Sequence, residues 1–148
     1  MRNKLMPFAI LLAAVLATGA RAQDWDHDAN IGAAVQALVA VHRAGGMDAA
    51  ATFVGDCYNT IDGYPDADIQ LQRLEYCAGM DFAGYLVGRQ SQAQEQEGEQ
   101  STPFFAAGAM FERMQRLDRW VQDPGMNQQV LRAWAATAAS SLLAQQQN

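Results

Sequence analysis

The chain has 148 residues, half of them hydrophobic, and a formal net charge of −6 at pH 7. This length fits a single domain that buries a core of its own. The acidic balance repels nucleic acid and anionic lipid at long range, so neither is an expected partner.

The first 22 residues have the features of a cleaved signal peptide. Arg2 and Lys4 form a short positive region, an apolar run extends from Leu5 to Leu16, and the small-residue motif ARA precedes Gln23. The run is shorter than the roughly 20 residues that cross a bilayer, although an uncleaved anchor is the alternative. We therefore expect a periplasmic or secreted bacterial protein, residues 23–148, without stable membrane insertion after cleavage.

Cleavage before Gln23 makes the protein more acidic. Three of the ten basic residues lie in the first 22 positions and none of the 16 acidic ones does, which leaves seven Arg and a net charge of −9. Such a charge keeps a protein soluble and favours a cationic partner.

The remaining chain is rich in Ala and has apolar periods of three and four residues, which predict an all-α fold. The expected helices cover residues 28–44, 48–60, 66 or 68 to 89, 103–121 and 127–143. Glycine, proline and acidic residues mark the turns between them. The polar tract 90–102 is predicted to be a linker. The expected architecture is one domain, a small irregular bundle of about five helices.

The two cysteines that follow the signal segment, Cys57 and Cys77, are predicted to form a disulfide. An even pair in an oxidising compartment favours a bridge, and their spacing does not match a zinc site. Because they lie on consecutive predicted helices, the bridge is expected to pin a helical hairpin. In the chain-entropy model it stabilises the fold by roughly 3 kcal/mol.

Asp81 interrupts the apolar stretch LEYCAGMDFAGYLVG, residues 74–88. On a helix it falls on the shoulder of the apolar stripe, beside a seam of small residues where another helix can approach closely. We expect a structural acid, half exposed or accepting hydrogen bonds from an Arg, a Tyr hydroxyl or a helix N-terminus. The functional alternative is a pocket carboxylate that acts with His42 or Tyr85.

The sequence contains no recognisable catalytic, cofactor or metal motif. No P-loop, nucleophile elbow, HExxH, EF-hand loop or dinucleotide fingerprint occurs. His27, in the sequence DWDHD, can bind a divalent cation only loosely, and acids there also favour a helix start. We therefore expect no metal, no cofactor and no enzymatic activity.

Three arginines recur every third residue in the fourth predicted helix, at Arg113, Arg116 and Arg119, and Trp120 follows them. Arg and Trp are common anchors of protein interfaces, so these four residues form the candidate partner surface. An ordinary charged solvent face is the alternative.

These features favour a monomeric or weakly dimeric exported protein that binds an unidentified protein partner. A small-ligand binder or an enzyme that uses Asp81 is the competing class. The general plan, a small exported helical protein with one bridge, is similar to that of bacterial amidase-immunity proteins and acid-stress chaperones. An immunity- or chaperone-like inhibitor is thus one form of the binding function, but none of those families' functional residues matches a position here.

Overall fold

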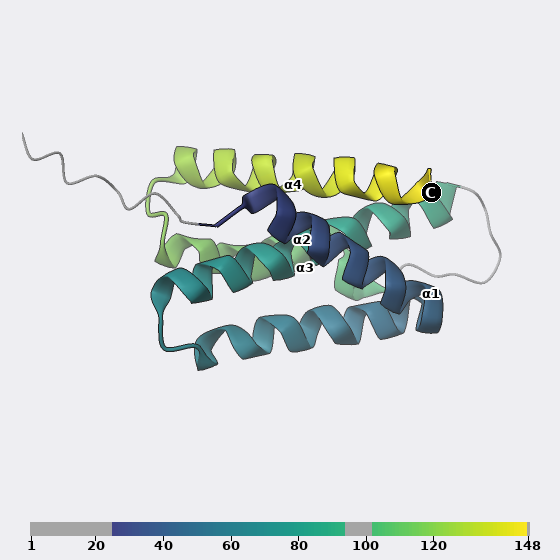
Figure 1. Cartoon of the computed structure of the whole chain (residues 1–148), viewed down its shortest axis with the longest axis horizontal. Helices are drawn as coiled ribbons and strands as arrows, with labels where there is room; N and C mark the ends of the chain where they lie inside the picture. The colour runs from purple at the N-terminus through teal and green to yellow at the C-terminus, as the bar shows by residue number, and fades with distance from the viewer. Residues whose placement is uncertain (1–24, 94–101, 148) are drawn as a thin grey trace, which may run out of the picture.

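A computed structural model describes residues 25–93 and 102–147. Within these residues there are four α-helices and no strand, which confirms the all-α prediction. The helices are α1 (His27–Thr60), α2 (Ala67–Ala93), α3 (Ala107–Met114) and α4 (Pro124–Gln146), joined by the short 3-10 turns η1 (Ile61–Gly63), η2 (Pro103–Phe105) and η3 (Gln115–Arg119). Figure 1 shows them in chain order.

The number of helices differs from the expected five because α1 spans the first two predicted helices. The break expected at Gly45-Gly46 is present as a kink, because Gly46 is the only residue inside α1 with non-helical dihedrals, at φ 72° and ψ −169°. A left-handed φ is easy for glycine and strained for other residues. One such residue bends the helix without inserting a loop, so the two halves run in different directions (Figure 1).

Side chains at the helix starts explain where several elements begin. Asp26, Thr102 and Asp123 each accept a hydrogen bond from a backbone amide two or three residues further along the chain. These bonds satisfy amides that lack a partner inside the helix. Pro103 and Pro124 directly follow two of the caps, where the absence of an N–H is harmless.

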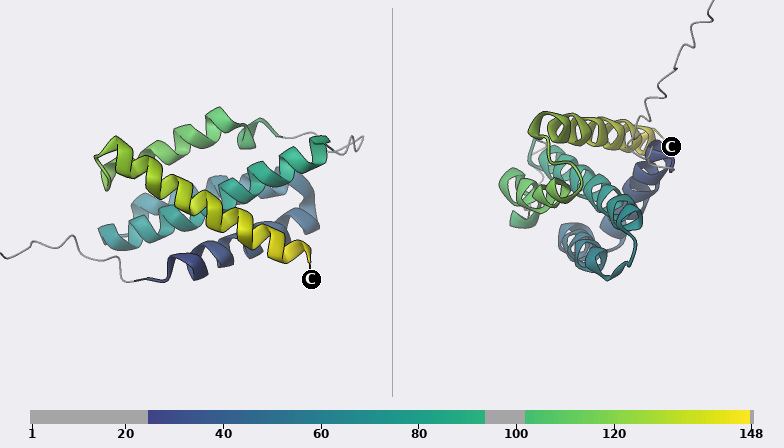
Figure 2. Two further views of the ribbon diagram at one scale, coloured as in Figure 1. Left: turned by 90° about the horizontal axis from the view of Figure 1, so that it is seen from above. Right: turned by 90° about the vertical axis from the view of Figure 1, so that its left-hand side faces the viewer.

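α2 is the central helix of the bundle. It packs against α1 and α4, and α3 and η2 also contact it. An end-on view places it between the other helices (Figure 2). Every residue from Cys77 to Gly84 is buried, so this stretch has no solvent-exposed side. The buried surface of α2 is therefore wider than the one apolar side expected from the sequence. Asp81, expected at the edge of that side, is fully buried.

The predicted disulfide is confirmed. Cys57 of α1 and Cys77 of α2 are bridged, with their Cα atoms 5.7 Å apart. Two glycines of α2 lie in the expected seam of small residues and face different neighbours. A Cβ on Gly79 would lie 3.2 Å from the side chain of Ile31, and one on Gly84 would lie 2.2 Å from the ring of Phe105. The small residues thus let the first half of α1 and the turn η2 approach α2 closely.

Two predicted segments lie mainly outside the described residues. The signal segment, residues 1–22, lies outside them entirely, and so do residues 94–101 of the predicted 90–102 linker. Residues 90–93 belong to α2, which runs to Ala93. Among the helices that the structure describes, none combines the length and hydropathy needed to span a membrane.

Candidate functional site

Asp81 accepts hydrogen bonds from two residues in the centre of the bundle. Arg113 of α3 donates from Nε to Oδ2 and from Nη2 to Oδ1, each over 2.8 Å. The hydroxyl of Tyr58 in α1 donates to Oδ2 over 3.2 Å. Asp81 therefore joins α1, α2 and α3 at one point, one helical turn beyond the disulfide at Cys77.

Arg113 is held on several sides. Its Nη2 also donates to the carbonyl oxygen of Phe104 over 2.7 Å, and its Cζ lies 3.8 Å from the centroid of the Phe104 ring. A bidentate pair with a carboxylate, combined with stacking on an aromatic face, is an arrangement that Arg makes and Lys cannot reproduce. This arrangement fixes both the guanidinium and the carboxylate in place.

Burial raises the pKa of Asp81 above its usual value, while the hydrogen bond and the charge of Arg113 lower it. Burial also raises the pKa of Tyr58 well above 10, and the negative charge of Asp81 adds to this effect. The Tyr58 hydroxyl therefore keeps its proton at neutral pH and acts as a donor. Asp81, Tyr58 and Arg113 thus form a buried polar cluster in which each carboxylate oxygen of Asp81 accepts at least one hydrogen bond.

The four predicted partner-binding residues all donate to acceptors inside the chain. Arg113 donates to Asp81, Arg116 to the carbonyl of Tyr58, Arg119 to the carboxylate of Asp62, and Trp120 to the carbonyl of Ala67. Together these bonds fasten α3 and η3 to α1, η1 and α2. The side chain of Arg119 is 53% exposed, whereas that of Arg113, which pairs with Asp81, is 17% exposed. Partner binding through these residues stays a prediction.

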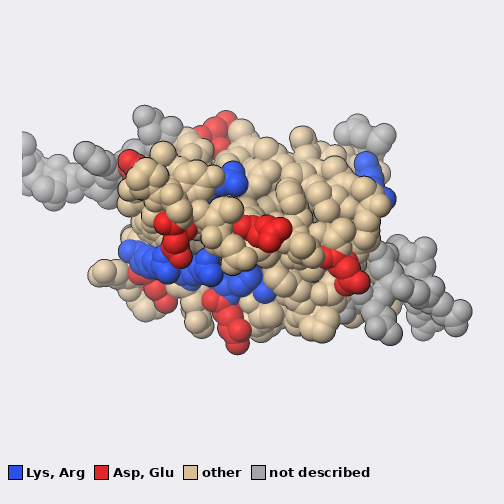
Figure 3. Space-filling model, turned by 90° about the horizontal axis from the view of Figure 1, so that it is seen from below, with Lys and Arg blue, Asp and Glu red and all other residues tan. Residues whose placement is uncertain are grey.

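One face of the molecule carries a row of basic side chains with acidic side chains along its edges (Figure 3). The mixture of signs limits the positive field that this row projects into solvent. An exposed ion pair such as that between Arg119 and Asp62 contributes little to stability.

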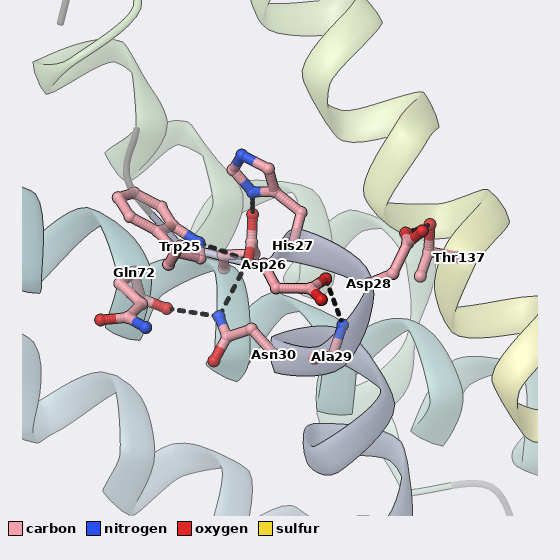
Figure 4. A network of polar contacts seen from close by, with 9 residues as sticks. Trp25, Asp26, His27, Asp28, Ala29, Asn30, Gln72 and Thr137 are labelled. Atoms are coloured by element: carbon pink, nitrogen blue, oxygen red, sulfur yellow. Dashed lines mark hydrogen bonds and ion pairs between the residues drawn. The ribbon is translucent and has the colours of Figure 1, made fainter. Parts of the chain in front are cut away.

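The structure also contains a buried acid that the sequence analysis did not single out. Glu75 of α2 is 0% exposed and accepts hydrogen bonds from the indole Nε1 of Trp25 over 2.9 Å and from Nδ2 of Asn30 over 2.8 Å. Nδ1 of His27 contacts its other oxygen. Figure 4 shows Trp25, His27 and Asn30 turned towards this common point. His27, which was considered only for loose cation binding, thus contacts a carboxylate of the core.

The side chains of the other residues considered for chemistry are not among the donors to the Asp81 carboxylate, which are Tyr58 and Arg113. The Tyr85 hydroxyl accepts a hydrogen bond from Arg89 over 3.2 Å. His42 lies half-buried on α1 and is not a hydrogen-bond partner of Asp81. In the part of the chain that the structure describes, no three His, Cys, Asp or Glu residues are grouped so that they could hold a metal ion.

An open apolar groove lies between α3 and α4, with α2 beneath it. Its volume is about 330 Å³, and its lining consists of Phe82, Phe111, Gln128, Leu131, Arg132 and Ala135. Phe82 is almost completely buried, whereas Phe111 is 55% exposed. A smaller hollow of about 230 Å³ shares Phe111, Gln128 and Leu131 with the groove and extends it towards η3. No local sequence pattern predicts this feature, because its walls come from three helices.

Comparison with protein-family models, with curated proteins and with solved structures finds no match for this chain.

Proposed function

We propose that this chain is an exported, non-catalytic helical protein that binds a protein partner through the groove between α3 and α4. The observation that carries the proposal is Phe111, a large apolar side chain that is 55% exposed at the edge of an apolar groove. Aromatic residues beside a concave apolar surface are typical anchors of protein interfaces.

The two buried carboxylates support a non-catalytic function. Asp81 accepts hydrogen bonds from Arg113 and Tyr58, and Glu75 accepts them from Trp25 and Asn30. A general acid or base must reach the proton that it transfers, and these oxygens face donors of the chain itself. Both acids connect helices, as expected of groups that stabilise the fold.

The groove fits an amphipathic helix from the partner. Two helices form its walls, and its floor and one edge offer the aromatic rings of Phe82 and Phe111 to apolar side chains. Arg132 at the rim is exposed and forms no ion pair with any described residue. We therefore expect the partner helix to carry apolar anchors at i, i+3 or i+4 and an acidic residue facing Arg132.

Export of the protein is part of the proposal. A disulfide between Cys57 and Cys77 fits an oxidising compartment such as the periplasm. Intact-mass measurement of the protein recovered from cells should give the mass of residues 23–148 with one bridge. Recovery of the uncleaved chain from the cytoplasm would contradict the export step while leaving the groove intact.

Site-specific photo-crosslinking in cells tests the groove. A photoreactive phenylalanine analogue at position 111 should yield a discrete protein adduct, identified by mass spectrometry. Leu143, which is 54% exposed and does not line the groove, provides the matched control position. With the purified adduct protein, Phe111→Ser should weaken binding by at least tenfold and Leu143→Ser by less than twofold. The same adducts at both positions, or equal effects of the two substitutions, would refute docking in the groove.

A further inference from the structure

A second hollow, which shares no residue with the groove, lies beside the disulfide between α1 and α2. Its volume is about 340 Å³, and its lining consists of Phe53, Asp56, Cys57, Thr60, Arg73, Tyr76 and Met80. The volume is at the lower end of the range for small-molecule sites, about 300–1,000 Å³. We refer to it as the Arg73 pocket.

Arg73 is held in this pocket by aromatic rings and not by an acid. Its Cζ lies 5.1 Å from the centroid of the Tyr76 ring and 5.7 Å from that of Tyr64. Its Nε is buried and has no hydrogen-bond partner, and no described residue forms an ion pair with it. Buried N–H groups are normally paired, and an Arg held by ring faces keeps its edge donors available. Arg73 is thus a guanidinium held over two rings, with no acid partner and no acceptor for its Nε among the described residues.

The opposite charge is also present in the pocket. Asp56 of α1 lines the same hollow, is exposed, and forms no ion pair with Arg73. Phe53, which is 39% exposed, and Met80 supply apolar wall beside the two charges. The pocket therefore offers one cation, one anion and an apolar surface within a volume suited to a small molecule.

We propose that the Arg73 pocket binds a small zwitterion of the amino-acid type with an apolar side chain. The carboxylate of the ligand pairs with the guanidinium of Arg73, whose planar fork matches a carboxylate. The ammonium group of the ligand faces Asp56. The apolar side chain of the ligand packs against Phe53 and Met80. A ligand with only one of the two charges leaves one charged residue of the pocket unpaired, which lowers its affinity.

Nuclear magnetic resonance titration of the ¹⁵N-labelled protein, expressed from the full-length sequence, tests this proposal directly. The probes are L-phenylalanine, 3-phenylpropionate, which lacks the ammonium group, and 2-phenylethylamine, which lacks the carboxylate. L-phenylalanine should shift the Arg73 Nε–Hε signal saturably, with a dissociation constant of about 1 mM or lower. Each single-charge analogue should bind at least about tenfold more weakly.

Matched variants assign the two charges. Arg73→Gln should abolish binding of L-phenylalanine, whereas Arg43→Gln, an exposed arginine on α1 that lines neither hollow, should leave it unchanged. Asp56→Asn should reduce the affinity for L-phenylalanine to that for 3-phenylpropionate. Because Asp56 is exposed, this variant decides the matter even if Arg73→Gln does not fold.

Three results would overturn the proposal. One is the lack of any saturable shift with L-phenylalanine up to about 20 mM, well above a millimolar dissociation constant. Another is equal affinity for L-phenylalanine and 3-phenylpropionate, which would leave Asp56 without a part in recognition. The third is unchanged binding in a folded Arg73→Gln variant.

Discussion

Replacement of Asp81 by Ala should destabilise the protein strongly, because it removes the acceptor of three hydrogen bonds at once. Two of these bonds come from Arg113 and one from the Tyr58 hydroxyl. Removal of one partner of a buried ion pair costs about 3–5 kcal/mol, since the other charge stays buried. Arg113 keeps 17% of its side chain exposed and retains the Phe104 carbonyl as an acceptor. We therefore expect a loss of about 3 kcal/mol, at the lower end of that range.

Asp81→Asn should cost less, about 1–2 kcal/mol, because the amide oxygen still accepts one hydrogen bond while the charge is lost. Equilibrium urea unfolding, followed by the fluorescence of the tryptophans, measures both changes. Glu112→Ala is the matched control: this acid precedes Arg113 on α3, is exposed, and should change stability by no more than about 0.5 kcal/mol.

A double-mutant cycle isolates the interaction between Asp81 and Arg113. Asp81→Ala combined with Arg113→Met should cost less than the sum of the single substitutions, because no unpaired charge remains in the core. The reasoning fails if Asp81→Ala costs less than about 1 kcal/mol, or if the two substitutions are additive.

Three further predictions concern the bridge, the close contact at η2 and the pH dependence of stability. Unreduced protein should have the mass of a chain lacking two hydrogens, and two thiols that alkylate without reductant would contradict the bridge. The double substitution Cys57→Ser and Cys77→Ser should lower the free energy of unfolding by about 2–5 kcal/mol. Gly84→Ala should destabilise the protein by about 1–3 kcal/mol, because the new Cβ would lie 2.2 Å from the ring of Phe105. Gly108→Ala, which has open space at its Cβ, is the control and should not destabilise it. Equal thermal midpoints of the two variants would refute the close contact. Arg113→Met removes the group that opposes the effect of burial on Asp81, so the pKa of Asp81 should rise further above 3.8. The folded variant then holds a proton that the unfolded chain releases. Its free energy of unfolding should therefore fall as pH rises from about 4 towards the raised pKa, and more steeply than that of the wild type. Urea midpoints of variant and wild type that change in parallel across this range would contradict the assignment.

Local sequence patterns were sufficient to predict the helical fold and its bridge. The period of the apolar residues indicates helices, and the chain contains only two cysteines, which lie on consecutive predicted helices. The bend at Gly46 and the start of η2 at Pro103 follow from the backbone preferences of these two residues. These properties depend on neighbours within a few positions, which a single sequence displays.

The surroundings of the two buried acids depend on distant residues. Arg113 lies 32 positions after Asp81, and Trp25 lies 50 positions before Glu75. A helical projection of α2 shows one apolar stripe, but it does not show that other elements cover the remaining sides of the helix. The position of Glu75 between Leu74 and Tyr76, close to Cys77, was a usable signal, since it places a second acid in the same apolar stretch.

The groove and the Arg73 pocket were beyond the reach of sequence patterns for a related reason. The groove combines side chains of α2, α3 and α4, and the Arg73 pocket combines side chains of α1 and α2. The arginines with the most regular spacing, Arg113, Arg116 and Arg119, have acceptors inside the chain. Arg73 has no regular pattern around it and has no acid partner among the described residues.

The donors of Glu75 also set a limit on how far the N-terminus of the protein can be trimmed. Trp25, His27 and Asn30 all lie within the first six described residues, and the expected cleavage point before Gln23 is two residues ahead of Trp25. An aminopeptidase that removed three residues from this new end would take away the indole donor, and two more would take away the imidazole contact. Glu75 would then remain in the core with Asn30 as its donor, so a small error in processing has the same consequence as a core substitution.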